Sequence, residues 1–347
     1  MKTIKIGYVG KQLLDTIYDI INIIKKYNLD INIEIVDDYT VNECDLVLYS
    51  LFSQSEYSND IYLFYNTCLN KSFFNKAKGN PKFLFFGFAE SHFWPYINHL
   101  WVKDNEYIKC NNELEDKLIR TINNYVPYNS NIKCYGITSY EDTTHNMYAP
   151  YCIMFGSICD ILYNDSSELI NRKKIKKTKF CNMFYNHGSY EREIIYQSLN
   201  NYKQIDSYSN FHKNQNCGYI DNSERFNNIM PSYKFSICFE NCHSDYNEGY
   251  ITEKICDGFF GGTVPIYWGN NKQIYEIFNE DSFINLTDVD QSKWLDIIKK
   301  YDEDDELYYK MLYANPIKDE NIYEKYVKRK EEFIIKILND DYYFNSY

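Results

Sequence analysis

The chain has 347 residues, of which 44% are hydrophobic and 18% aromatic, and a net charge of −12. This composition excludes a disordered protein and leaves room for two domains, each with its own core. The acidic balance argues against nucleic acid as a main partner, because no excess of cations is available to displace phosphate counterions.

The first half of the chain alternates strand and helix. Ile4, Ile6 and Tyr8 alternate with polar or small residues, and an apolar stripe at helical spacing follows from Leu13 to Ile24. Near-continuous apolar strands between amphipathic helices predict a parallel sheet covered on both faces. The further strands expected here are 31–36, 45–49, 82–87 and 132–137.

A change of composition at about 164–179 predicts a linker. Its basic run, Arg172 to Lys179, is expected to be a solvated face; a nuclear-import or polyanion-binding role is the weaker alternative. We therefore predict an N-terminal domain at 1–165, with an insertion at about 92–131. The C-terminal domain is predicted at 178–338, and its last helix could pack back on the first domain.

The second half repeats the alternation, so the chain predicts two Rossmann-like α/β domains facing a cleft. The expected strands are 180–185, 204–208, 235–239, 264–268 and 283–286, and the expected helices are 190–199, 223–230, one from 252, one from 291 and 321–338.

The sequence contains few of the motifs that indicate a cellular compartment or a cofactor. The N-terminus lacks the apolar core of a signal peptide, and no apolar run approaches the roughly 20 residues that span a bilayer. Eleven cysteines without regular spacing favour buried thiols in a reducing compartment. We expect a soluble, cytoplasmic protein without a transmembrane segment. No Gly-rich phosphate loop is present, which weakens a dehydrogenase or ATPase interpretation.

Acidic pairs give no metal site. Asp304 and Asp305 lie in a stretch, 301–306, that we expect to be solvated. Neither this pair nor Asp37-Asp38 sits at the end of an apolar strand in the way that a metal–diphosphate clamp would require. No catalytic metal is therefore expected. An enzyme that expels a nucleotide diphosphate without a metal can instead use a helix N-terminus and fixed cations.

The segment Gly249-Tyr-Ile-Thr-Glu-Lys254 offers both. Thr252 is the expected N-cap, and Lys254 is expected to be free to reach an anion. The alternative is an ordinary capped helix with a surface Glu and Lys. The residues expected to face the core at helical spacing are Ile251, Ile255 and Phe259.

Arg192 is the second candidate cation, because it starts a helix just beyond a strand end. A guanidinium matches phosphate oxygens in a bidentate fork. A surface pair with Glu191 or Glu193 is the alternative. Asn186 and His187 lie in the same turn, where an Asn is often only a turn residue.

Glu90 is the candidate general base. It follows the apolar strand 82–87, and transfer to a hydroxyl needs a base on the side opposite the leaving group. A solvated loop glutamate is the alternative.

These motifs together resemble family 10 glycosyltransferases, the α1,3/α1,4-fucosyltransferases. The Phe239-Glu-Asn241, Tyr250–Lys254 and Gly262–Ile266 block is the most specific part, and Ser282–Asn285 is similar to a later family strand. The turn from Asn186 to Arg192 is also similar. The base motif is matched at Glu90 and Ser91, with His92 where proline is usual.

The resemblance implies an inverting enzyme of the GT-B fold that uses GDP-fucose and requires no cofactor. Arg192 and Lys254 would bind the diphosphate, and Glu90 would be the base. Glu253 would lie near the fucose and the ribose and favour the charge that develops at the anomeric carbon. Glu240 would brace the loop. The donor-binding residues implied are Asn186, Arg192, Asn241, Tyr250, Glu253 and Lys254.

The expected reaction is transfer of L-fucose to a glycan hydroxyl, α1,3 to N-acetylglucosamine. A transferase for another GDP-deoxyhexose and an inactive glycan-binding protein are the alternatives. The aromatic side chains of the 92–131 insertion could stack on sugars, although a small core is favoured. The sequence leaves the acceptor and the oligomeric state open.

Overall fold

The computed structural model describes residues 2–9, 14–36, 44–50, 82–87, 133–138, 146–154, 156–162, 166–241, 243, 249–270 and 273–339. The chain divides into two compact units. Unit 1 is Met1–Tyr148 with Lys328–Tyr347, and unit 2 is Ala149–Val327.

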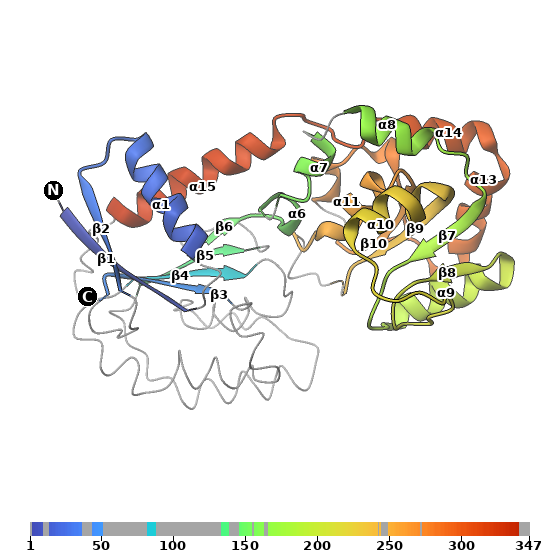
Figure 1. Ribbon diagram of the computed structural model, residues 1–347, viewed down its shortest axis with the longest axis horizontal. Coiled ribbons are helices and arrows are strands. Elements are labelled where there is room, and N and C mark those ends of the chain that lie inside the picture. Colours follow the sequence, from blue (N-terminus) through green and yellow to red (C-terminus); the bar gives the residue numbers. More distant parts are fainter. Residues whose placement is uncertain are drawn as a thin grey trace. The chain divides into compact units, whose positions relative to one another are not determined.

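Unit 1 is built on a six-stranded sheet in the order β2-β1-β3-β4-β5-β6, and all its pairs are parallel. The predicted alternation is confirmed in part of β1: Ile4 and Ile6 are buried, but Gly7 is buried as well and Tyr8 is half-buried. Helix α1 (Leu14–Lys26) buries Ile17 and Ile20. Figure 1 shows α1 over one face of this sheet. The strands are β1 (Lys2–Val9), β2 (Ile31–Val36), β3 (Leu46–Ser50), β4 (Lys82–Gly87), β5 (Lys133–Thr138) and β6 (Asn146–Tyr148).

The C-terminal part of α15 (Ile322–Asn339) belongs to unit 1 and packs beside α1 (Figure 1). Lys26 Nζ lies 2.7 Å from Glu331 Oε2, and the Tyr27 hydroxyl donates to the same oxygen at 2.8 Å. Ile334 and Ile337 are buried. This end of the helix is therefore held by apolar packing as well as by an ion pair.

Unit 2 is built on a five-stranded parallel sheet in the order β11-β10-β9-β7-β8. The chain runs from β7 to β8 on one side and then returns to β9 on the other. Such a reversal leaves a crevice at the carboxyl ends of the two strands, where open α/β sheets bind ligands. The strands are β7 (Lys179–Met183), β8 (Ile205–Ser207), β9 (Tyr233–Phe239), β10 (Val264–Trp268) and β11 (Ile284–Asn285).

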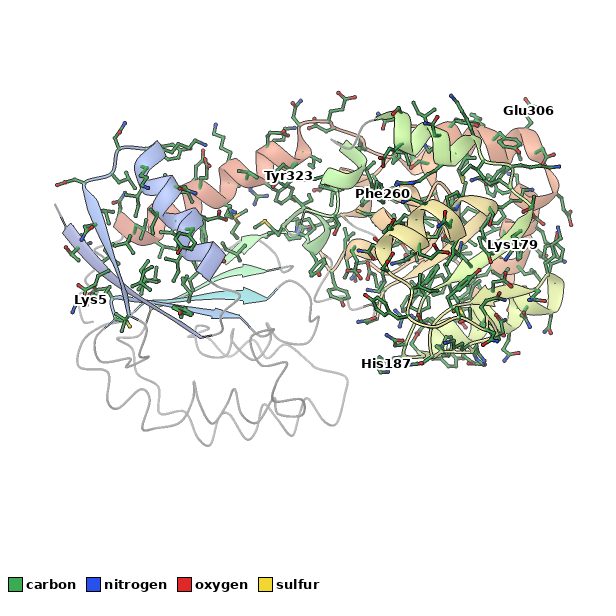
Figure 2. The ribbon with its side chains drawn as sticks, in the orientation of Figure 1. Lys5, Lys179, His187, Phe260, Glu306 and Tyr323 are labelled. Atoms are coloured by element: carbon green, nitrogen blue, oxygen red, sulfur yellow. The ribbon has the colours of Figure 1, made fainter. Side chains whose placement is uncertain are left out.

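Short and long helices cover this sheet, and their side chains fill the space against it (Figure 2). The core is aromatic: the rings of Phe239 and Trp294 meet edge to face at 5.5 Å, and Phe235 packs on Tyr308. The helices are α6 (Tyr151–Met154), α7 (Cys159–Leu162), α8 (Ser166–Lys174), α9 (Tyr190–Tyr202), α10 (Asn222–Glu224), η4 (Arg225–Ile229), η5 (Met230–Ser232), α11 (Glu253–Phe260), α12 (Ile274–Ile277), η6 (Glu280–Ser282), η7 (Gln291–Lys293), α13 (Trp294–Glu303) and α14 (Asp305–Tyr313).

The basic run is only partly the solvated face that we expected: Lys174, Lys176 and Lys179 are exposed, but Arg172, Lys173 and Lys177 are not. Arg172 is buried; it donates to the Phe260 carbonyl at 3.1 Å and stacks on the Phe260 ring at 4.0 Å. Lys177 Nζ donates to the carbonyls of Pro231 and Gly262 at 2.7 and 2.6 Å. Helix and turn ends leave carbonyls without partners, and these cations satisfy them. The run therefore joins α8 to the end of α11.

The acidic stretch 301–306 is also only partly solvated. The Asp302 side chain is 2% exposed and forms ion pairs with Lys203 and with Lys234, the latter at 3.3 Å. Asp304 caps the N-terminus of α14 by accepting from the Leu307 amide. Buried carboxylates persist only when paired.

The predicted helix at 223–230 is instead a succession of short turns. After α10, the π-helical turn η4 ends with the Met230 amide donating to the Arg225 carbonyl. Pro231 then lies in the first turn of the 3₁₀ helix η5.

Candidate functional site

The predicted carboxyl edge of unit 2 is centred where β7 and β9 separate. Tyr185, two residues past β7, fills the gap between them: its hydroxyl donates to the Ile237 carbonyl at 2.8 Å and accepts from the Phe239 amide at 2.6 Å. Burial raises the pKa of this phenol above its ordinary value, so it stays protonated. The tyrosine thereby keeps the strand ends fixed.

Arg192 lies at this gap, in the first turn of α9, whose N-cap is Ser189. Its side chain is buried, with 4% of the residue exposed. The guanidinium donates to the Phe239 carbonyl at 2.8 Å and to Asn241 Oδ1 at 2.9 Å, and its carbon lies 3.9 Å from the centre of the Tyr185 ring. Nε is buried without a hydrogen-bond partner among the described residues.

The alternative of a surface pair for Arg192 is wrong. Glu193 instead accepts from Gln197 at 2.7 Å and lies 2.7 Å from His212 Nε2. The buried guanidinium therefore has carbonyl and amide partners rather than a carboxylate. Its positive charge is not neutralised by a direct ion pair within the described residues.

The start of α11 is held by a buried carboxylate. Thr252 is the N-cap, as predicted, and Ile251, Ile255 and Phe259 are buried. Glu240 is fully buried; it accepts from the Thr252 amide at 2.7 Å and from the Thr252 hydroxyl at 2.6 Å. The predicted bracing role of Glu240 agrees with these contacts.

Lys254 is not free, so that expectation is wrong. Its Nζ lies 3.4 Å from Glu240 Oε2 and 3.5 Å from Glu253 Oε1, and it donates to Thr252 Oγ1 at 2.9 Å. Burial alone would lower the pKa of Lys254, but Glu240 and Glu253 raise it above its ordinary value. The ammonium is therefore charged and fixed in position. The Glu253 side chain is 39% exposed.

The other predicted donor-site residues have different surroundings. Asn241 is exposed at the end of β9 and links Arg192 to the hydroxyl of Tyr250 at 3.4 Å. Tyr250 is only 1% exposed, and its carbonyl accepts from Asn270 at 3.2 Å. Asn186 is exposed in the turn after β7. Arg192, Asn241 and Tyr250 thus form one hydrogen-bonded chain, and Asn186 lies on the surface.

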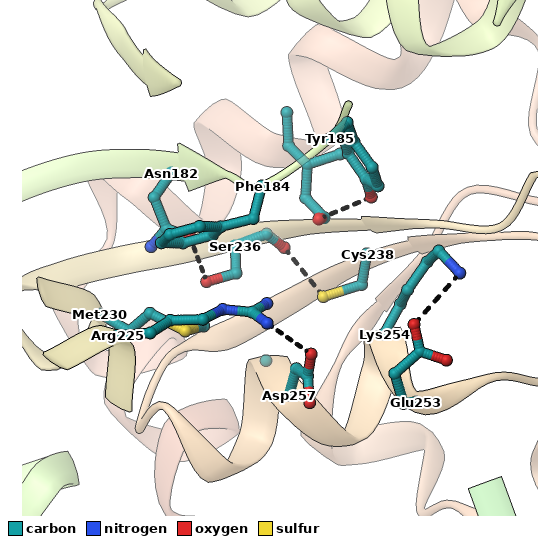
Figure 3. Close-up of a pocket in the computed structure, with 12 residues that line it drawn as sticks. Asn182, Phe184, Tyr185, Arg225, Met230, Ser236, Cys238, Glu253, Lys254 and Asp257 are labelled. Carbon is teal, nitrogen blue, oxygen red and sulfur yellow. Dashed lines mark hydrogen bonds and ion pairs between the residues drawn. The ribbon is translucent and has the colours of Figure 1, made fainter. Parts of the chain in front are cut away.

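A pocket lies between β7, β9 and α11, and Figure 3 shows its side chains. Lys254 and Glu253 line it, and Arg192 contacts its wall through Tyr185. The sequence analysis missed most of the other lining residues, among them Phe184, Arg225 and Asp257. Asp257 could have been found, because it lies one helical turn from Lys254 and on the same face.

Glu90, Ser91 and the 92–131 insertion lie outside the described residues. Within the part that is described, His, Cys, Asp and Glu side chains do not gather in groups of three or more that could hold a metal ion. In the same part, no helix has the length and apolar character needed to cross a bilayer.

Residues 171–340 match the family model described as "Glycosyltransferase family 10 (fucosyltransferase) C-term". This part of the chain belongs to glycosyltransferase family 10. The match includes all the donor-site residues predicted in unit 2. The family 10 resemblance found in the motifs is thereby confirmed.

Curated relatives agree with this family. The chain is 35% identical over 127 residues to "Alpha-(1,3)-fucosyltransferase FucT" of Helicobacter pylori, covering 36% of this chain and 25% of that protein. It is 26% identical over 189 residues to "Putative fucosyltransferase R654" of Acanthamoeba polyphaga mimivirus, covering 50% of this chain and 31% of that protein. The aligned part is thus less than a third of either relative.

A solved structure extends the likeness to both units. A crystal structure of an α1,3-fucosyltransferase with GDP-fucose aligns with a TM-score of 0.59 and 18% identity, covering 100% of this chain and 94% of that one. At this identity the likeness concerns the fold. The predicted α/β fold of the GT-B class, with its parallel sheets, is confirmed.

Proposed function

We propose that this chain is an inverting glycosyltransferase that moves L-fucose from GDP-fucose to a hydroxyl of a glycan. The observation that carries the proposal is the start of α11. There a capped helix N-terminus, the fixed ammonium of Lys254 and the half-exposed Glu253 meet at the strand crossover of a family 10 domain. A helix N-terminus with an added cation suits a departing diphosphate.

In the proposed reaction the acceptor oxygen attacks the anomeric carbon of fucose, and the bond from that carbon to the phosphate oxygen breaks. The electron pair leaves with GDP, whose new charge is met by Lys254 and the first amides of α11. Glu253 favours the positive charge at the anomeric carbon. The hydroxyl proton goes to Glu90, our proposed general base.

In this proposal Arg192 does not bind the phosphate oxygens directly in a bidentate fork. Its terminal nitrogens already donate to His187, Phe239 and Asn241. We propose that its uncompensated charge attracts the diphosphate, while Asn241 and Tyr250 present polar groups to the nucleotide sugar. Asn186, exposed in the adjoining turn, completes the proposed donor set.

The acceptor is proposed from the relatives. Besides the bacterial α1,3-fucosyltransferase, the chain is 36% identical over 98 residues to mouse "4-galactosyl-N-acetylglucosaminide 3-alpha-L-fucosyltransferase 9", covering 26% of each chain. We therefore propose transfer α1,3 to N-acetylglucosamine of a galactosylated glycan. A cytoplasmic location also stays a prediction.

A donor and acceptor screen tests this proposal. The full chain is incubated with GDP-fucose and N-acetyllactosamine, and with other GDP-hexoses and GDP-deoxyhexoses in parallel. We expect fucosylated product from GDP-fucose alone. Turnover of another GDP-sugar, with none of GDP-fucose, would assign a different donor; glycan binding without any turnover would leave a binding protein.

The base is tested separately with Glu90→Gln. This variant should bind GDP-fucose with unchanged affinity and lose transfer, because the amide cannot take a proton. Equal transfer by Glu90→Gln and wild type would remove Glu90 from the mechanism.

A further inference from the structure

The proposed chemistry uses Lys254 but not the charge of the buried carboxylate that holds it. Glu240 is fully buried, and its Oε2 lies 3.4 Å from Lys254 Nζ. Its two oxygens also accept hydrogen bonds from the amide and the hydroxyl of Thr252. A neutral carboxylic acid or amide can hold the same two groups. Bracing of the helix start therefore does not require the negative charge, whose burial costs stability unless it is paired.

Lys254 serves two carboxylates whose surroundings differ. Its Nζ lies 3.4 Å from Glu240 Oε2 and 3.5 Å from Glu253 Oε1 (Figure 3). The side chain of Glu253 is 39% exposed, whereas that of Glu240 is 0% exposed. Water can therefore solvate Glu253 when the ammonium moves away. Glu240 has no such replacement, so its ionised form depends on Lys254.

The strands around Glu240 supply no second cation among the described residues. Burial raises the pKa of Tyr267 on β10, of Cys238 on β9 and of Tyr185 beyond β7, so all three stay protonated and neutral. On the side of Gly269 a Cβ atom would lie 2.7 Å from Glu240 Cγ, so the backbone there packs directly against the side chain. The carboxylate is thus enclosed, with Lys254 as its compensating charge.

Arrival of the donor changes the charge balance at the start of α11. Before binding, the carboxylates of Glu240 and Glu253 are balanced by the cations of Lys254 and Arg192, which influence one another electrostatically. A bound diphosphate adds a negative charge on each phosphate and, in the proposed reaction, shares the ammonium of Lys254. Like charges near a carboxylate favour its protonated form. Glu253 stays in contact with water, so Glu240 is the carboxylate that gains most from a proton.

We propose that Glu240 takes up a proton when the donor binds and returns it when GDP leaves, while Lys254 changes partner from this carboxylate to the diphosphate. This inference rests on the proposed function, since it assigns a positioning role at the same donor site. The proton comes from solvent by way of Lys254, whose side chain is 18% exposed. The ammonium passes a proton to Glu240 Oε2 and regains one from the buffer.

The protonated acid keeps the start of α11 in place. Oε1 still accepts from the Thr252 amide, at 2.7 Å in the free protein. The protonated Oε2 donates to Thr252 Oγ1, at 2.6 Å, so this hydrogen bond is kept with its direction reversed. Lys254 can then leave Glu240 without leaving an unpaired charge behind, and the burial that already raises the pKa of Glu240 favours the exchange.

The test is a calorimetric titration of the full chain with GDP-fucose at pH 7, in buffers of low and high ionisation enthalpy such as PIPES and Tris. The slope of the observed enthalpy against the ionisation enthalpy of the buffer gives the protons taken up on binding. Both phosphates of GDP-fucose are esterified and stay ionised near neutral pH, so the ligand does not contribute. We expect wild type to take up about 0.5–1 proton per donor bound, and its Kd to rise by up to about tenfold per unit of pH.

Glu240→Gln should bind the donor without proton uptake, because the amide does not titrate. Glu253→Gln is the matched control, since it removes a carboxylate at nearly the same distance from the same ammonium, and it should keep the uptake. Donor binding by wild type without proton uptake, or unchanged uptake in Glu240→Gln, overturns the inference. If Glu240→Gln does not fold, a wild-type Kd that does not change with pH overturns it. Absence of any donor binding would instead reject the proposed function itself.

Discussion

Replacing Lys254 by alanine should separate stability from activity in an informative way. The substitution removes the only cation within 4 Å of the fully buried Glu240 among the described residues. Breaking a buried pair by deleting one partner costs about 3–5 kcal/mol. Glu240 keeps two hydrogen bonds from Thr252, and burial already raises its pKa, so it can take up a proton. We therefore expect a loss near the lower end, about 3 kcal/mol.

The effect on the reaction has another origin. Removing a fixed hydrogen-bond donor that faces the negative charge developing in the transition state typically lowers turnover by about 100- to 1,000-fold. Adding Glu240→Gln to Lys254→Ala removes the unpaired charge, while the amide oxygen can still accept from the Thr252 amide. The double variant should therefore regain most of the lost stability and none of the lost turnover.

The assays are urea unfolding followed by far-UV circular dichroism, and initial rates of GDP-fucose turnover at saturating donor. Lys310→Ala, at an exposed site on α14, is the control and should match wild type in both. Turnover of Lys254→Ala within about threefold of wild type would refute the diphosphate role. Recovery of turnover in the double variant would show that the loss was one of folding.

Three further predictions concern pH and metal. Burial raises the folded-state pKa of Asp257, which lies beside Arg225, to about 6. The free energy of unfolding should therefore fall as pH rises from about 4 to 6, by a total of about 3 kcal/mol at pH 7. Asp257→Asn should be more stable than wild type at pH 7 and equally stable at pH 4. Asp302 should behave oppositely: burial would raise its pKa, but Lys203 and Lys234 lower it, so its stabilisation is fully present above about pH 4 and is lost as pH falls through the lowered pKa. Asp302→Asn should cost about 3 kcal/mol at pH 7 and progressively less as pH falls below about 4. EDTA should leave transfer substantially intact.

Urea midpoints across this pH range, with wild type measured in parallel, check the two carboxylates. An Asp257→Asn variant that is less stable at pH 7, or an Asp302→Asn variant with a pH-independent loss, would contradict the assigned environments. Transfer abolished by EDTA and restored by a divalent ion would contradict a metal-free clamp.

Local patterns predicted much of unit 2. Continuous apolar runs gave β9 and β10 within two residues of their observed ends, since strands buried on both faces need apolar side chains throughout. The N-cap at Thr252 and the core-facing residues of α11 were also predictable, because both depend on neighbours within one or two helical turns.

Long-range partners were not predictable in the same way. Lys254 looked free because Glu240 is 14 positions away and reaches it only when β9 and α11 pack together. Lys177 looked solvated because its acceptor carbonyls, at Pro231 and Gly262, belong to distant turns. Arg225 was not predicted, because its partners in the pocket, Asp257 and Phe184, are more than 30 positions away in the sequence.

The most direct test is a crystal structure of the full chain with GDP bound. The account predicts the β-phosphate at the N-terminus of α11, with an oxygen within hydrogen-bonding distance of Lys254 Nζ. A diphosphate bound elsewhere on the chain, with Lys254 still held only by Glu240, Glu253 and Thr252, would contradict it.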